Sequence, residues 1–211
     1  MNIHETIAMM VFMAEGMISS QDLLTQADKA IGDGDHGVGM ARGFEAVREL
    51  LEQQDFSDLG ELLQSIGMTL LTSIGGAAGA IFGTFFIGGS KNLSNKTCFD
   101  AHSLAHLLED GLRDVEYRGK AAPGDKTMVD ALHPAAKAAR ANVSKPLELS
   151  LIRTAEAAKD GMENTKEMVA TIGKAKSLGE RSLGHPDPGA LSVSLMLQFM
   201  TEYVESLNGS I

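Results

Sequence analysis

The sequence has little cysteine and little positive charge, and both shortages exclude classes of protein. Its single cysteine, Cys98, rules out a framework of intramolecular disulfide bonds and fits a reducing compartment. Only 18 lysine and arginine residues stand against 28 aspartate and glutamate residues, which gives a formal net charge of −10. Because affinity for nucleic acid comes from clustered basic side chains, we expect no nucleic-acid partner. A nucleotide is not excluded, since a metal ion can screen its charge.

The chain also lacks a recognisable targeting signal and the most common phosphate-binding motif. Glu5 and Glu15 interrupt its apolar start, so we expect no signal peptide and a cytoplasmic location. No GxxxxGK(S/T) sequence occurs, which excludes an ordinary P-loop fold. With 211 residues, of which 44% are hydrophobic, the chain is long enough to bury a sizeable core. We expect one domain over residues 1–211.

From Gly67 to Ser90 the chain carries no charged residue, and this stretch is long enough to cross a bilayer. Glycines recur in it at four-residue spacing, as in closely packed membrane helices. The central pair Gly75-Gly76, however, can divide the run into two shorter helices, and several threonines lower its hydrophobicity. We therefore expect two buried core helices here and no membrane span.

Strand-type alternation is absent, and apolar residues recur at helical spacing instead. Between residues 59 and 70, five apolar side chains follow the i, i+3, i+4, i+7, i+11 pattern of one buried stripe. The sequence therefore predicts an all-α protein. The expected helices cover residues 4–29, 36–53, 58–74, 76–91, 99–117, 125–141, 148–172 and 188–207. Asp125 and Asp187 are the expected N-caps of two of them, and Pro188 suits the first helical position.

Three aspartates gather in a glycine-rich segment. We expect Asp28 in the last turn of a helix, with Asp33 and Asp35 in the turn that follows. Side chains two residues apart in an extended turn can point to the same side, and the intervening glycines let the chain fold back. Carboxylates this close raise one another's pKa unless a cation neutralises them. Hard oxygen ligands of this kind favour Mg²⁺ or Ca²⁺.

Other interpretations of such residues are weaker. An Asp-Gly-rich turn is often only a solvated loop, which remains the simplest alternative. A calcium EF-hand that starts at Asp33 fails, because its twelfth position is Phe44 and not glutamate. The glycines at 32, 34 and 37 match the dinucleotide fingerprint, but no strand precedes them. His102 and His106 stand four apart without a third ligand, which favours surface histidines over a metal site.

Four long blocks occur in order along the chain. They are Asp28-x4-Asp33-Gly-Asp35-His36-Gly37, GMTLLTSIGGAAGAIFGTFF from residue 67, RGKAAPGDKTMVDAL from residue 118 and LGERSLGHPDPGALS from residue 178. Together they resemble the nucleotide-binding L subunit of dihydroxyacetone kinase, over residues 24–199. The resemblance implies an eight-helix antiparallel barrel with a nucleotide site at one end. The related fatty-acid kinases share the aspartate turn but usually carry threonine where His36 stands.

The resemblance also implies a set of site residues. Asp28, Asp33 and Asp35 would hold two Mg²⁺ ions against the phosphates of ADP or ATP. Family members often have arginine where Lys174 stands and asparagine where Gly39 stands; lysine keeps the charge but loses the bidentate fork. No catalytic side chain is expected beyond the metal–nucleotide site. The implied nucleotide contacts are His36, Gly37, Val38, Gly39, Ala77, Ala78, Gly119, Thr127, Met128, Lys174, Asp187, Pro188 and Gly189.

Finally, the resemblance implies partners. The ketose would be bound on a separate K subunit, through a histidine that this chain does not supply. The nucleotide would either exchange as ATP or stay bound as ADP and be rephosphorylated by a phosphotransferase-system protein, the M subunit. The separate chain favours the second mode. Dihydroxyacetone is the default ketose, and erythrulose fits equally well. An ADP-carrying regulatory module without transferase activity is the alternative, and a homodimer is compatible with the sequence.

Overall fold

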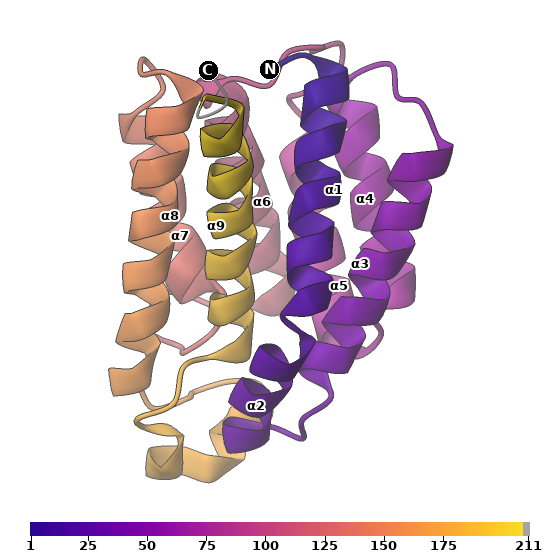
Figure 1. Cartoon of the computed structure of the whole chain (residues 1–211). Helices are drawn as coiled ribbons and strands as arrows, with labels where there is room; N and C mark the ends of the chain where they lie inside the picture. Colours follow the sequence, from indigo (N-terminus) through magenta and orange to yellow (C-terminus); the bar gives the residue numbers. More distant parts are fainter. Residues whose placement is uncertain (209–211) are drawn as a thin grey trace.

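The computed structural model describes residues 1–208, which are helical and contain no named β-strand (Figure 1). The expected all-α fold is confirmed. The α-helices are α1 (Ile3–Ser19), α2 (Gln21–Ile31), α3 (His36–Gln53), α4 (Leu59–Ser73), α5 (Gly76–Ser90), α6 (Ala101–Gly119), α7 (Val129–Ala141), α8 (Leu147–Asn164) and α9 (Pro188–Asn208). Two 3-10 helices, η1 (Thr165–Glu167) and η2 (Lys174–Ser182), lie between α8 and α9.

The eight longer helices form a closed ring. From α3 to α9 each helix packs on the next one along the chain, and α1 closes the ring by packing on both α3 and α9. Neighbouring helices run in opposite directions, so that both termini of the described chain lie at the same end (Figure 1). The short helix α2 lies at the other end, against α3, α9 and η2. This arrangement confirms the eight-helix antiparallel barrel, with α2 as an addition.

The prediction of one helix over residues 4–29 is wrong. Two helices, α1 and α2, meet there at an angle of 55°. The backbone N–H and the hydroxyl of Ser20 both donate to the carbonyl of Gly16, at 3.1 and 2.8 Å. A serine hydroxyl that bonds back to the preceding turn competes with the helical ladder and favours a bend. The bend directs α2, and with it Asp28, across the end of the barrel.

Two other predicted boundaries are also wrong. The helix expected at 125–141 begins only at Val129, because Gly124 and Lys126 have left-handed φ angles of +99° and +61°. Asp125 is not its N-cap: the Asp125 carboxylate accepts the Ala122 N–H at 2.7 Å. The helix expected at 148–172 ends at Asn164. There the carbonyl of Thr165 accepts a hydrogen bond from Lys126 at 2.5 Å.

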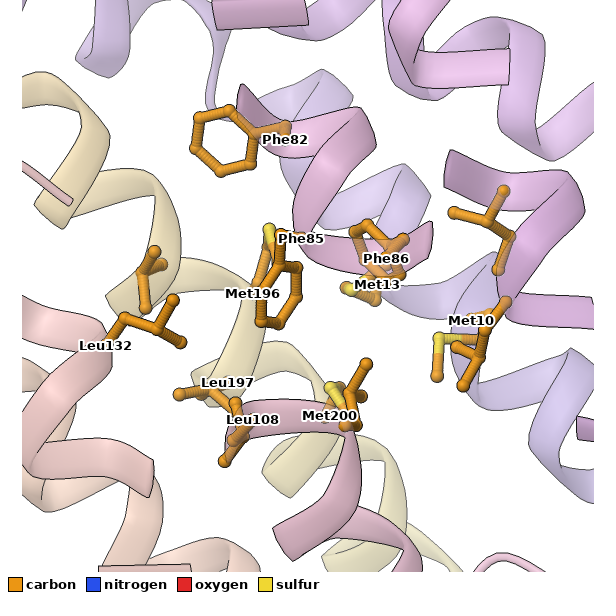
Figure 2. Close-up of a cluster of buried hydrophobic side chains, with 14 of the residues drawn as sticks. Met10, Met13, Phe82, Phe85, Phe86, Leu108, Leu132, Met196, Leu197 and Met200 are labelled. Carbon is orange, nitrogen blue, oxygen red and sulfur yellow. The ribbon is translucent and has the colours of Figure 1, made fainter. Parts of the chain in front are cut away.

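The barrel encloses one continuous core of aliphatic, aromatic and methionine side chains. Figure 2 shows side chains from α1, α5, α6, α7 and α9 meeting inside the ring. The rings of Phe85 and Phe86 pack edge to face, with centroids 5.0 Å apart. Flexible methionines fill the space between such rings. The residues labelled in that view are Met10, Met13, Phe82, Phe85, Phe86, Leu108, Leu132, Met196, Leu197 and Met200.

The charge-free run Gly67–Ser90 is divided as expected. The break lies between α4 and α5, where Gly75 and Gly76 adopt φ angles of +81° and +59°. Within residues 1–208, no single helix combines the length and apolar character needed to cross a membrane; only the bent α1–α2 pair meets those criteria when taken together.

Helices α4 and α5 approach each other through glycine. A Cβ atom added to Gly83 would lie 2.8 Å from the carbonyl oxygen of Gly67 and 2.8 Å from the Cβ of Leu71. Both distances are far below van der Waals contact, and a backbone carbonyl cannot move aside cheaply. The close packing of this helix pair therefore requires glycine at position 83.

We expect Gly83→Ala to lower the free energy of unfolding by about 2 kcal/mol, because overpacking at this interface forces α4 and α5 apart. Urea denaturation followed by circular dichroism measures the change. Gly79→Ala on the same helix is the matched control, since its added Cβ would meet neighbours only at 3.3 Å. Equal losses in the two variants would contradict the tight α4–α5 contact.

Candidate functional site

Four helices begin at the same end of the barrel. Helices α3, α5, α7 and α9 all begin at the end where α2 lies (Figure 1). The first N–H groups of a helix have no partner within the helix, and its dipole places partial positive charge there. An anion bound at this end would therefore face several helix N-termini at once.

A cavity of about 610 Å³ opens at this end of the barrel. It lies between the α2–α3 turn and the α4–α5 turn, and carboxylates line one side while small residues line the other. Its lining residues are Asp28, Asp33, Gly34, Asp35, His36, Val38, Gly39, Arg42, Ile74, Gly75, Gly76, Ala77, Ala78 and Lys174.

The three predicted aspartates meet at this cavity. Asp28 is buried in the last turn of α2, whereas Asp33 and Asp35 are exposed in the following turn. One carboxylate oxygen from each lies within 4.8 Å of the other two. A Cβ added to Gly32 would lie 2.0 Å from the Asp28 carboxylate, so glycine is needed for this fold-back. In the part of the chain that the structure describes, no other three His, Cys, Asp or Glu residues gather this closely.

A lysine from a distant part of the chain faces the aspartates. The Lys174 ammonium, at the start of η2, donates to Asp33 at 2.5 Å and to both Asp35 oxygens at 3.3 Å. This hydrogen bond lowers the pKa of Asp33 and raises the pKa of Lys174. The ammonium offsets part of the negative charge that the cluster would otherwise concentrate.

His36, on α3, contacts residues of three other helices, α2, α5 and α9. Its backbone N–H, at the start of α3, donates to the Asp28 carboxylate at 3.1 Å. Its ring lies 6.2 Å from the ring of Phe82 on α5, and its Nε2 lies 2.8 Å from the hydroxyl oxygen of Ser192 on α9. Burial lowers the pKa of His36, and the nearby charges of Asp28 and Asp35 oppose that shift.

The cavity also contains an arginine that the sequence analysis missed. Arg42 donates from Nε to the Ser73 carbonyl at 2.7 Å and from Nη2 to the Ile74 carbonyl at 2.5 Å. It thereby satisfies carbonyls at the C-terminal end of α4 and holds the turn into α5. The helical spacing could have revealed it, because Arg42 follows Asp35, the residue before α3, by seven residues, or about two helical turns.

A second group of charges lies between the α6–α7 loop and the start of α9. Lys126 is 2% exposed, and its ammonium donates to the carbonyls of Thr165 and His185 at 2.5 and 2.6 Å. Burial lowers the pKa of Lys126, while Asp187 and Asp130 oppose that change. The Asp187 carboxylate accepts the Ala190 N–H at 2.8 Å, as expected of the residue that caps α9.

Removal of the Asp187 carboxyl from water raises its pKa to about 7, and the Asp130 charge adds to the effect, whereas Lys126 and the Ala190 N–H oppose it. The folded-state value is higher than the ordinary value of 3.8. At pH values between 3.8 and about 7, the Asp187 carboxyl is protonated in the folded protein but ionised in the unfolded chain. The free energy of unfolding therefore falls as the pH rises through this window.

We expect Asp187→Asn to remove most of that decline, which reaches about 1.4 kcal/mol per pH unit at its steepest. Asparagine still caps α9 but cannot ionise. Urea denaturation at a series of pH values between about 4 and 8 measures the slope. Asp55→Asn, at an exposed loop position between α3 and α4, is the control and should keep the wild-type slope. The same slope in both variants would show that Asp187 does not carry the pH dependence.

The expected nucleotide contacts fall into two groups. His36, Val38, Gly39, Ala77, Ala78 and Lys174 line the cavity together with the three aspartates. Gly37, Gly119, Thr127, Met128, Asp187, Pro188 and Gly189 do not. Gly37 faces α2, where an added Cβ would lie 2.2 Å from the Thr25 hydroxyl. Gly189 lies against Met128, since its added Cβ would be 3.2 Å from the Met128 Cβ.

The family model of the DAK2 domain matches residues 30–202. The chain belongs to the DAK2 domain family. The match contains Asp33, Asp35 and the starts of the four helices that begin at this end of the barrel. The family resemblance drawn from the four sequence blocks is confirmed.

Several curated proteins share this DAK2 likeness. The chain is 41% identical over 186 residues to the ADP-binding subunit DhaL of the PEP-dependent dihydroxyacetone kinase of Escherichia coli, covering 86% of this chain and 88% of that protein. It is 37% identical over 188 residues to the corresponding subunit of kinase 1 from Listeria innocua, with coverage of 89% and 90%. An L-erythrulose kinase from Pectobacterium atrosepticum is 34% identical, but the chain covers only 32% of it.

A solved structure shares the DAK2 fold. The dihydroxyacetone kinase from C. freundii, in complex with AMP-PNP and Mg²⁺, superimposes with a TM-score of 0.75 at 26% identity. The superposition covers 93% of this chain and 33% of that kinase, so the chain corresponds to about a third of the larger protein.

Proposed function

We propose that this chain is the ADP-binding subunit of a dihydroxyacetone kinase and that it holds ADP or ATP, through Mg²⁺, in the cavity at the starts of α3 and α5. The observation that carries the proposal is the meeting of three carboxylates at a cavity faced by helix N-termini. The names of the curated relatives and the AMP-PNP–Mg²⁺ complex of the related kinase support it. The cytoplasmic location expected from the sequence is part of the same proposal.

The residues at the cavity fit magnesium. Asp28, Asp33 and Asp35 offer hard oxygen donors within 4.8 Å of one another, and the exposure of Asp33 and Asp35 leaves them accessible from the cavity. We assign these residues as ligands of the two expected ions. When bound, magnesium would offset the negative charge of the nucleotide phosphates. Lys174, which already neutralises part of the cluster, would contribute further positive charge beside the phosphates.

The backbone at the start of α5 suits the phosphate chain. Gly76, Ala77 and Ala78 belong to the first turn of α5, whose N–H groups have no partner within the helix, and all three line the cavity. A Cβ added to Gly76 would meet nothing within 4 Å, which leaves that side of the turn open to a ligand. Val38 and Gly39 line the cavity from α3.

The purine or ribose would lie towards the α6–α7 loop and the start of α9. Gly119 ends α6, and an added Cβ there would lie 3.4 Å from Ile81, one turn beyond Ala77 and Ala78 on α5. Met128 and Gly189 pack together beside Asp187. We propose that Gly119, Thr127, Met128 and the segment 187–189 form this side of the nucleotide site.

Transfer itself requires little chemistry from this chain. Its residues would hold the terminal phosphoryl group in line with a ketose hydroxyl and surround the phosphates with positive charge. Any general base would come from the K subunit that binds the ketose. The site can therefore function without a nucleophile of its own.

The names of three relatives indicate which phosphoryl donor those proteins depend on. The proteins from E. coli and L. innocua are named PEP-dependent, and a relative from Lactococcus lactis is named PTS-dependent. We propose that ADP stays bound here as a cofactor and is rephosphorylated by an M subunit of the phosphotransferase system. Erythrulose is a second candidate substrate, because an L-erythrulose kinase is among the relatives.

A reconstitution tests the function. The purified chain is mixed with a dihydroxyacetone kinase K subunit and Mg²⁺, and is supplied either with ATP or with phosphoenolpyruvate and the phosphotransferase proteins including M. We expect dihydroxyacetone phosphate with the second donor, and Asp33→Ala as a matched inactive variant. Comparison of dihydroxyacetone with erythrulose decides the substrate. Tight binding of Mg-ADP without product from either donor or either ketose would contradict the kinase function. It would indicate an ADP-carrying regulatory module without transferase activity.

A further inference from the structure

One polar side chain beside the site has a role that core packing does not explain. Ser192 lies on the first turns of α9 and has no exposed surface. Its hydroxyl oxygen lies 2.8 Å from Nε2 of His36, which lines the cavity from α3. A buried hydroxyl at this position links the starts of two helices that face the proposed nucleotide site.

The single hydrogen of the Ser192 hydroxyl bears on the direction of this contact. The Ser192 hydroxyl donates its single hydrogen to the Pro188 carbonyl at 3.0 Å. With that hydrogen directed at Pro188, the oxygen is left to accept from His36, which favours a hydrogen on Nε2. The Pro188 carbonyl also faces the His36 imidazole and can only accept. Both partners on the α9 side are thus acceptors, which favours a hydrogen on Nε2 whether the ring is neutral or charged.

The imidazole is held from a second direction. The ring of Phe82, on α5, lies 6.2 Å from it at an interplanar angle of 45°. With Nε2 bonded toward α9 and the tilted Phe82 ring beside it, rotation of the imidazole is restricted. Nδ1 is then the nitrogen that remains for a ligand in the cavity; it accepts a hydrogen bond when the ring is neutral, and it donates to a phosphate oxygen when the ring is protonated.

We propose that Ser192 is a positioning residue, which holds the His36 imidazole with Nε2–H toward α9 and Nδ1 toward the bound nucleotide. The proposal rests on the nucleotide-binding function proposed above. It adds a residue of α9 that acts on the site through His36 and does not touch the ligand. It also couples the start of α9 to the start of α3.

Nuclear magnetic resonance of the ¹⁵N-labelled, ligand-free chain tests the geometry independently of binding. Long-range ¹H–¹⁵N correlations assign which His36 nitrogen carries the hydrogen. We expect the Nε2–H form in the wild type and a larger share of the Nδ1–H form in Ser192→Ala, where only the Pro188 carbonyl remains as an acceptor on the α9 side. Ser194→Ala, a buried serine on the same helix, is the control and should retain the wild-type signals. A wild-type ring with its hydrogen on Nδ1 alone would overturn the proposal.

A double-mutant cycle tests whether Ser192 acts through His36. Calorimetric titration of ADP with Mg²⁺ should show about fivefold weaker binding for Ser192→Ala, the effect of losing one hydrogen bond, and wild-type binding for Ser194→Ala. In the His36→Ala background, Ser192→Ala should have no further effect, because its partner is absent. A fivefold loss that persists in that background would show a merely structural role.

The two tests separate the possible failures. Absence of Mg-ADP binding by the wild type, together with the expected His36 signals, would contradict the nucleotide function and leave the imidazole geometry intact. Wild-type affinity and unchanged His36 signals in Ser192→Ala would overturn the positioning role while the nucleotide function stands. If Ser192→Ala does not fold, the wild-type His36 signals alone decide the direction of the hydrogen bond.

Discussion

Replacing Asp33 by alanine is expected to weaken Mg²⁺-dependent ADP binding by more than about 100-fold while leaving the helical fold unchanged. Asp33 supplies one of the three carboxylates that meet at the cavity. Its removal takes away an oxygen donor and also frees the Lys174 ammonium, now 2.5 Å from Asp33, to move closer to Asp35. The loss of a ligand and the stronger competition from Lys174 both act against the metal. Calorimetric titration measures the affinity, and circular dichroism checks the fold.

The fold should survive because Asp33 is exposed and lies in a turn outside the core. Asp55→Ala makes the same chemical change at an exposed position in the α3–α4 loop, at the other end of the barrel, and should bind ADP like the wild type. An Asp33→Ala variant with wild-type affinity would remove the aspartate cluster from the proposed function.

Replacing Lys126 by methionine is expected to lower the free energy of unfolding by about 3 kcal/mol at a pH above 7. Methionine keeps most of the side-chain volume but leaves the carbonyls of Thr165 and His185 without the ammonium that now bonds both. It also removes the positive charge near Asp187. Urea denaturation measures the loss.

This loss should be smaller near pH 5. The pKa of Asp187 in the folded protein is about 7, above its ordinary value of 3.8. The Asp187 carboxyl of the folded protein is therefore protonated at pH 5 and ionised above pH 7. The missing Lys126 charge therefore matters most where Asp187 is ionised. Lys120→Met is a matched control, because Lys120 lies in the same loop with a left-handed φ of +52° but is exposed. Similar losses in both variants would contradict the role of the buried ammonium.

The features that depend on local pattern could be predicted from the sequence. Apolar residues at helical spacing predicted the positions of most helices, because each helix must bury one face against the core. The aspartate cluster was also predictable, since Asp28, Asp33 and Asp35 lie within eight residues and glycines permit the fold-back. The capping of α9 by Asp187 followed from its side chain and the proline after it.

The features that depend on distant contacts could not be predicted. The end of α8 at Asn164 depends on Lys126, which is almost forty residues away in sequence and takes the carbonyl of Thr165. The contact of Lys174 with Asp33 joins residues 141 apart. No local pattern encodes such partners. The break at Ser20 is different, because a serine between two helical stretches gives too weak a signal against the helical pattern around it.

The most direct test of the central claim is a calorimetric titration of ADP into the nucleotide-free chain, with and without Mg²⁺. A metal–nucleotide site built on the three aspartates predicts tight binding only when Mg²⁺ is present, with slow release of ADP. Equal affinity with and without Mg²⁺, or no binding in either case, would contradict it.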